Sequence, residues 1–264
     1  MSGGDCLRKK EAMRLAILAG EILLQNGAEI TRVQETIRRI LEAFGIRDHH
    51  IFVISNGIFA TVDEDGAAPL CAVRHVSRSQ LNLTRVAQVN DLAREIVARE
   101  GDCDIDACVA RLNACAAAPG NPFWLQLLAC AVGCACFAYI LGGSAWDSCA
   151  AFTAGLALYC FLAQSGKRRM SPYIERILAG ALGTLCCQLL LLGGVGHELD
   201  RMIIGVIMPL VPGVAITTAI RDFFNTDYLS GIIHLADAAL AAASIAVGVG
   251  AMLYAWSLLQ GVAL

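Results

Sequence analysis

Hydrophobic and polar positions follow two different patterns along this chain of 264 residues. Up to about residue 120, apolar residues recur at the spacing of one helix face, and charged residues occupy the opposite face. This pattern predicts amphipathic helices at about 11–25, 29–44, 81–100 and 104–117. Between the second and third of these, β-branched and aromatic residues predict strands at 51–54, 58–62 and 70–76. The first 120 residues therefore predict an α+β domain.

Beyond residue 120 the pattern changes to long apolar stretches. The segment 118–122, Ala-Pro-Gly-Asn-Pro, breaks the chain and marks the boundary. Five stretches that are long and apolar enough to cross a bilayer follow at about 123–141, 145–163, 173–192, 202–220 and 230–259. The first is uncharged and would form about 28 Å of helix. The predicted fold is a membrane α-helical bundle of five transmembrane helices (121–264) with an N-terminal soluble α+β domain (1–120).

Composition supports this division. The chain is 57% hydrophobic with a mean hydropathy of +0.61. Residues 1–120 contain 30 charged side chains, whereas residues 121–264 contain only 13. The net charge of −3 offers no basic surface to compensate phosphate repulsion, so we expect no nucleic-acid partner.

The twelve cysteines do not predict a metal site. Seven of them lie inside apolar stretches, where a thiol acts as a small hydrophobic group. Cys103, Cys108 and Cys115 lack Cys-x-x-Cys spacing and have no nearby histidine. We therefore expect no bound metal, and no motif in the chain predicts a cofactor.

The distribution of basic residues predicts the orientation of the spans. Lys167, Arg168 and Arg169 cluster between the second and third spans, and such clusters stay on the cytoplasmic side. With five crossings, the N-terminal domain would be cytoplasmic and the C-terminus outside. Arg201, which falls on the outer side in this scheme, is a minor exception.

An interruption in the fourth span is the most informative feature of the apolar half. Pro209 and Pro212 each remove a backbone donor, and Gly213 adds backbone freedom at the same place. A break at membrane depth frees polar main chain that must find partners in protein or in a watered cavity, as in the broken helices of transporters. Thr217 and Thr218 would add hydroxyl groups one turn further on. A simple packing kink explains the spacing equally well.

Two ionisable residues in the fifth span are candidates for moving protons. His234 and Asp237 are three residues apart, which puts them on one helix face. Ionisable residues inside a span often serve proton relays, although this pair lies in the first two turns and could simply be hydrated. Asp147 and Glu175 also lie near span ends, where we expect them to act as helix-start residues.

A hydrolase site in the first domain is a weaker interpretation. The polar residues that could be assembled into one are His49, His50, Ser55, Asp63, His75 and Ser77. Their spacing matches neither Gly-x-Ser-x-Gly nor His-Glu-x-x-His. We therefore predict that the chain is not an enzyme.

Several segments resemble the threonine/serine exporter family in its split, two-component form. These are residues 18–34 with Asn26-Gly27-Ala28 and Thr31-Arg32-Val33, Asn82-Leu83 with Val89-Asn90, Pro209-Leu210-Val211-Pro212-Gly213 through Arg221-Asp222, and Ser230-Gly231. They occur in the expected order and cover nearly the whole chain. This chain is similar to the larger subunit of such a pair.

The resemblance implies a function, a location and a partner. Members are associated with proton-driven efflux of threonine and serine, or of dicarboxylates such as succinate, across the inner membrane. Because full-length members carry a second membrane half, the resemblance implies a hetero-oligomer in which a small integral membrane subunit supplies that half.

The candidate site residues follow from the interruption and from this resemblance. We expect a substrate carboxylate to meet a site built from Pro209, Pro212, Gly213, Thr217, Thr218, Arg221 and Asp222. Arg221 could instead anchor the span beside Asp222. Asp237, with His234, would couple protons. The alternative is a membrane-anchored sensor or hydrolase-like protein whose spans dock a partner.

Overall fold

A computed structural model describes residues 3–63, 68–77, 81–166 and 170–260. The chain forms two compact units, Met1–Gly120 and Asn121–Leu264, which divide at the Pro-Gly segment. Lys167, Arg168 and Arg169, on which the predicted orientation rests, lie outside the described residues.

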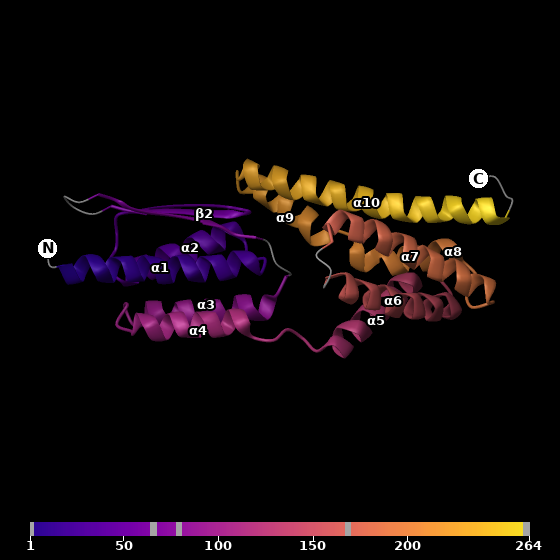
Figure 1. Ribbon diagram of the computed structural model, residues 1–264, viewed down its shortest axis with the longest axis horizontal. Coiled ribbons are helices and arrows are strands. Elements are labelled where there is room, and N and C mark those ends of the chain that lie inside the picture. The colour runs from indigo at the N-terminus through magenta and orange to yellow at the C-terminus, as the bar shows by residue number, and fades with distance from the viewer. Residues whose placement is uncertain (1–2, 64–67, 78–80, 167–169, 261–264) are drawn as a thin grey trace. The chain divides into compact units, whose positions relative to one another are not determined.

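The N-terminal unit contains the predicted order of elements. It consists of α1 (Gly3–Gln25), α2 (Ile30–Ala43), β1 (His49–Ile54), β2 (Gly57–Val62), β3 (Leu70–His75), α3 (Leu83–Ala98) and α4 (Ile105–Ala117) (Figure 1). Helix α1 begins eight residues before its predicted start, because Arg8 to Glu11 are good helix formers that lack an apolar period. Gly27 has a φ of 82° and ends this helix in the left-handed conformation.

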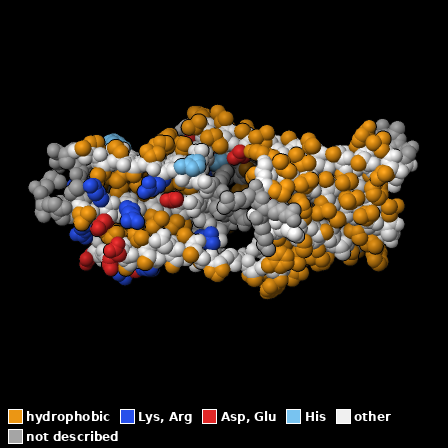
Figure 2. All heavy atoms as spheres, viewed as in Figure 1, with side chains coloured by type: hydrophobic (Ala, Val, Ile, Leu, Met, Phe, Trp, Pro, Cys, Tyr) orange, Lys and Arg blue, Asp and Glu red, His pale blue; other side chains and the backbone are white. Residues whose placement is uncertain are grey.

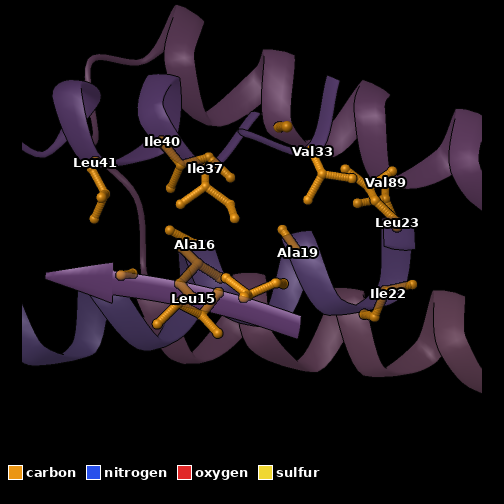
Figure 3. Close-up of a cluster of buried hydrophobic side chains, with 14 of the residues drawn as sticks. Leu15, Ala16, Ala19, Ile22, Leu23, Val33, Ile37, Ile40, Leu41 and Val89 are labelled. Atoms are coloured by element: carbon orange, nitrogen blue, oxygen red, sulfur yellow. The ribbon is translucent and has the colours of Figure 1, made fainter. Parts of the chain in front are cut away.

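The core of this unit lies where α1 and α2 face each other. Figure 3 shows the apolar side chains of both helices directed into one cluster, which also includes Val89 from α3. A Cβ added to Gly20 would lie 2.5 Å from Cδ1 of Ile37, so a larger residue at this position would require the Ile37 side chain to shift. The helical spacing of the apolar residues in α1 and α2 thus specifies which faces of these two helices are buried.

The three strands form one antiparallel sheet in the order β1-β2-β3. Ile58, Ala60 and Val62 of the central strand are buried. On the other face, Phe59 lies opposite Phe52 on one side and Val73 on the other, and all three are exposed. One face of the sheet therefore joins the core, while the other carries a row of exposed apolar side chains.

The C-terminal unit is entirely helical within the described residues. It contains α5 (Phe123–Ile140), α6 (Ala145–Ser165), α7 (Pro172–Leu192), α8 (Leu199–Ile207), the short 3-10 helix η2 (Met208–Leu210), α9 (Gly213–Phe224) and α10 (Tyr228–Gln260). Four of these helices, α5, α6, α7 and α10, are long and apolar enough to cross a membrane. The number rises to five if the bent pair α8–η2 and α9 forms one span.

Apolar side chains of the C-terminal unit point outward. Only 17% of the apolar window of α5 is buried, and no more than 33% of the windows in α6, α7 and α10. Figure 2 shows hydrophobic side chains over most of the visible face of this unit, whereas charged side chains gather on the visible face of the N-terminal unit. So much exposed apolar surface is stable in lipid and not in water, so this unit is a multi-pass membrane domain.

Candidate functional site

The predicted interruption is a true break of the helix. The segment Leu199–Leu210 and α9 meet at an angle of 57°. Pro209 lies in η2, Val211 is extended, and Pro212 caps the start of α9. The two prolines cannot donate to the preceding turn, which explains why the helix stops and restarts here. The 202–220 stretch, predicted as one span, is therefore two helices with different directions.

Polar main chain is open at the start of α9. No side chain caps this helix, and the Gly213 amide donates only to the Val211 carbonyl, at 2.8 Å. Among the described residues, the amides of Val214 and Ala215 have no acceptor outside the helix. A Cβ added to Gly213 would meet nothing within 4 Å, so this backbone faces open space. The positive end of α9 is therefore accessible to an anion.

The two threonines beyond the break differ in their surroundings. Thr217 is exposed, and its hydroxyl donates to the carbonyl oxygens of Gly213 (3.1 Å) and Val214 (3.0 Å). Thr218 is half-buried. The Thr217 hydroxyl thus uses its proton within the helix, which leaves its oxygen as an acceptor.

The structure does not gather all the predicted substrate residues into one place. Arg221 and Asp222 follow Gly213 by eight and nine residues, which puts their backbone about 12–14 Å along α9. Arg221 is exposed, whereas Asp222 is buried. The predicted set therefore separates into a group at the break, Pro209 to Thr218, and a group at the far end of α9.

The buried carboxylate at the far end of α9 meets a histidine of α10. Asp222 Oδ2 lies 2.7 Å from Nδ1 of His234, and only 5% and 2% of the two side chains is exposed. Phe223 packs against Gly231, where a Cβ would lie 3.0 Å from its ring, so that glycine allows α9 and α10 to meet closely. The hydroxyl oxygen of Ser230, one turn before His234, is buried without a hydrogen-bond partner in the described part of the chain.

Asp237 lies beside a tyrosine of α7. The hydroxyl of Tyr173 in α7 lies 3.4 Å from Asp237 Oδ1, and Asp237 is half-buried. His234 and Asp237 are three residues apart on α10, but His234 hydrogen-bonds to Asp222, which lies twelve residues earlier in the sequence. Sequence spacing could not reveal this pair because it joins two helices.

Asp147 has a role that sequence reasoning identified only in part. It forms the capping box of α6 with Ser144, so the predicted helix-start role is confirmed. Its other oxygen, Oδ1, accepts from the amides of His197 (2.6 Å) and Glu198 (3.0 Å). One buried carboxylate therefore joins the α5–α6 connection to the α7–α8 connection. Only the acidic residue in the first turn was visible in the sequence.

A second buried polar group was missed entirely. Gln188 of α7 is 2% exposed, and its Oε1 has no hydrogen-bond partner among the residues that the structure describes. Thr184, one turn earlier, is fully buried and donates to the Gly180 carbonyl. An isolated glutamine in an apolar stretch carries no periodic signal, so no sequence pattern could have indicated it.

The structure places the polar residues that the sequence offered for a hydrolase site in different surroundings. His49 bonds to the Ile46 carbonyl at 3.2 Å, and Ser55 is buried. Asp48, His50 and Asp63 bring one ligand atom each within 4.8 Å of one another, but all three are exposed. Such exposed groups are common without an ion, and nothing else in the described residues marks this cluster as a metal site.

Comparisons with known proteins show which proteins the chain is similar to. The family model described as "Putative threonine/serine exporter" matches residues 14–256. The probable succinate transporter subunit YjjP of Escherichia coli (strain K12) is 28% identical over 256 residues, covering 95% of this chain and 97% of that protein.

The protein of the same name from Klebsiella aerogenes is 26% identical over 257 residues, with 96% and 97% coverage. No solved structure matches the chain. The family and both relatives are named as transporters and not as enzymes. The chain belongs to the threonine/serine exporter family.

Proposed function

We propose that this chain is one subunit of a proton-coupled exporter of small carboxylate-bearing metabolites, either threonine and serine or dicarboxylates such as succinate. The observation that carries this proposal is the broken helix: α9 has an open amino end at the break, and at its other end it carries Asp222, whose buried carboxylate pairs with His234 of α10. The family description names threonine and serine, and the name of the two relatives includes succinate.

The substrate carboxylate binds at the break. The open amides of Val214 and Ala215 lie at the positive end of the α9 dipole, and no residue charge opposes an anion in the described segment 208–218. Broken helices of transporters present anionic substrates with this kind of helix end. Pro209, Pro212 and Gly213 keep these amides open, and Thr218 stands one turn further along the helix.

The proton binds at the other end of α9, on Asp222 and His234. A protonated imidazole beside an ionised carboxylate forms a charge-assisted hydrogen bond, which is stronger than the bond made by the neutral ring. Gain or loss of the proton therefore changes how firmly α9 is held to α10. Because the two ends of α9 are separated by about 12 Å, coupling acts through the position of the helix and not by direct contact. Asp237, beside Tyr173, is the second candidate for the proton.

A second subunit closes the site. Within the C-terminal unit α9 packs chiefly against α10, and α8 packs against α5, α6 and α7 (Figure 1). Gly213, Thr217 and Arg221 consequently remain exposed. Polar groups at membrane depth need protein or water around them, so the uncovered side of α9 is where a small membrane subunit would dock. In this proposal the N-terminal unit lies in the cytoplasm, and the complex lies in the inner membrane.

The substitution Asp222→Asn tests the proton role while keeping the shape of the side chain. Membrane vesicles are prepared from cells of the protein's own source in which the variant replaces the unmodified chain. Efflux of labelled succinate or threonine that is driven by a pH gradient should then fall to the level of vesicles without the chain. Exchange of labelled for unlabelled substrate should persist, because exchange moves no net proton. His234→Gln should behave in the same way.

Asp200→Asn provides the matched control, since Asp200 is an exposed carboxylate in the first turn of α8. It should leave gradient-driven efflux unchanged at equal protein levels. The purified chain reconstituted alone should not transport. Full gradient-driven efflux in Asp222→Asn, combined with its loss in Asp237→Asn, would move the proton role to Asp237 and overturn the proposed pair.

A further inference from the structure

A cationic groove crosses the surface of the N-terminal unit between α2 and α3. It encloses about 440 Å³, a volume within the range of small-molecule sites, which is about 300–1,000 Å³. Arg32 and Arg39 line it from α2, and Asn90 and Arg94 line it from α3. The buried residues Thr36 and Ala93 contribute to its floor. The groove belongs to the N-terminal unit, in which no described helix is a candidate membrane span, and no residue of α9 lines it.

The fold explains why two distant segments supply this groove. Val33 and Val89 belong to the same buried core cluster, which Figure 3 shows between the helices. Their sequence neighbours Arg32 and Asn90 are consequently turned to the edge of the α2–α3 contact. These four residues come from Thr31-Arg32-Val33 and Val89-Asn90, two motif segments that the proposed transport site does not use.

The positive charge in the groove is not neutralised from within. Glu35 contributes a carboxylate to the lining of the groove, but this carboxylate already bonds Arg38 and Arg39 at 2.5 Å. The two guanidinium groups hold the pKa of Glu35 below its usual value. Arg94 reaches Asp91 only at 3.8 Å, with 78% and 74% of the two side chains exposed, and such a contact contributes little. Arg32 forms no ion pair within the described ranges. Two guanidinium groups on facing helices thus remain available.

We infer that this groove binds a small dianion, a dicarboxylate or an inorganic phosphate, by its oxygen atoms. A guanidinium group donates two parallel hydrogen bonds to a carboxylate or phosphate, and Arg32 and Arg94 approach from opposite walls. Asn90, which lines the groove from α3, adds a neutral amide donor. Ala93 and Val97 offer an apolar surface that fits the short carbon chain of a dicarboxylate. This inference does not depend on the proposed transport function.

The test measures binding to the full-length protein in detergent. Succinate and inorganic phosphate are the probes, and threonine, which has no net charge, is the comparison ligand. Calorimetry gives affinity, and hydrogen–deuterium exchange of peptides covering α2 and α3 locates the site. Succinate or phosphate should slow exchange in both helices, whereas threonine should not. Arg32→Gln and Arg94→Gln should each weaken binding about tenfold or more, because each removes a charge-assisted contact.

Arg47→Gln is the matched control, because Arg47 is an exposed arginine of the same unit that neither lines the groove nor bonds Glu35. It should leave affinity and exchange unchanged, as should Asp222→Asn in the membrane unit. Equal protection of α2 and α3 by succinate or phosphate in the Arg32→Gln/Arg94→Gln double variant would overturn the inference. So would protection of α2 and α3 by vesicles of anionic phospholipid with no response to succinate or phosphate.

Discussion

Single glycines in the apolar helices determine how closely two helices can pack against each other. A Cβ on Gly248 of α10 would collide with the Ile177 carbonyl oxygen of α7, whereas a Cβ on Gly250 would meet nothing within 4 Å. A Cβ added to Gly180 of α7 would similarly lie 3.1 Å from the Ile245 carbonyl oxygen of α10. Small residues let helices approach closely, and the structure shows that Gly180 and Gly248 lie in such a contact whereas Gly250 does not.

The pair Gly248 and Gly250 gives a direct test of this packing. Gly248→Ala should lower the melting temperature of the protein in detergent, because overpacking a tight contact costs about 1–3 kcal/mol. Gly250→Ala should leave it unchanged or raise it slightly, since alanine favours the helix. The melting curve of each variant in detergent gives its melting temperature. Equal effects of the two substitutions would mean that α7 and α10 do not pack as described.

At the scale of elements, the break between α8 and α9 decides what the fourth apolar stretch can do. A continuous helix would bury its own amides in hydrogen bonds and leave nothing for a ligand. The break keeps amides at Val214 and Ala215 open and lets α8 pack with α5, α6 and α7 while α9 packs with α10. The same residues that interrupt the helix thereby separate two packing environments.

Replacing both prolines should straighten this stretch. In Pro209→Ala/Pro212→Ala the missing donors return, and alanine is favoured over proline in a helix interior by about 3 kcal/mol. Hydrogen–deuterium exchange at Val214 and Ala215 should slow, and substrate efflux should fall sharply. Pro172→Ala is the control, because Pro172 lies at the first position of α7, where proline is tolerated. Unchanged efflux with a protected α9 start would refute a role for the break.

At the scale of the whole molecule, the number of crossings determines whether the two termini lie on the same side of the membrane or on opposite sides. The described helices allow four spans, or five if the bent pair crosses as one. From Leu199 to Phe224 the pair contains 26 residues, about 39 Å of helix if straight, which is enough to cross despite a bend. We therefore expect an odd number of crossings.

Reporter fusions test that expectation. A green fluorescent protein at the N-terminus should fluoresce and alkaline phosphatase at the C-terminus should be active, since the first folds inside and the second outside the inner membrane. An inactive phosphatase at the C-terminus, with a fluorescent fusion at the same position, would show an even number of crossings. The bent pair would then be a re-entrant loop that returns to its side of entry.

The sequence by itself determined the features that depend on neighbouring residues. Long apolar stretches, helix-breaking prolines, the amphipathic helices of the N-terminal unit and the capping role of Asp147 are all local properties. Hydrogen bonding and burial within one element decide each of them, so periodicity and composition were sufficient to predict them. The family motifs were equally readable, because they are short runs of adjacent residues.

Only the tertiary structure decided which distant residues meet. His234 pairs with Asp222 because α9 and α10 touch at Gly231, and Asp147 reaches His197 and Glu198 because two helix connections converge. Arg32 and Arg94 share a groove because the core aligns α2 with α3. Helix crossings depend on the packing of whole surfaces, and no spacing within a single helix contains that information.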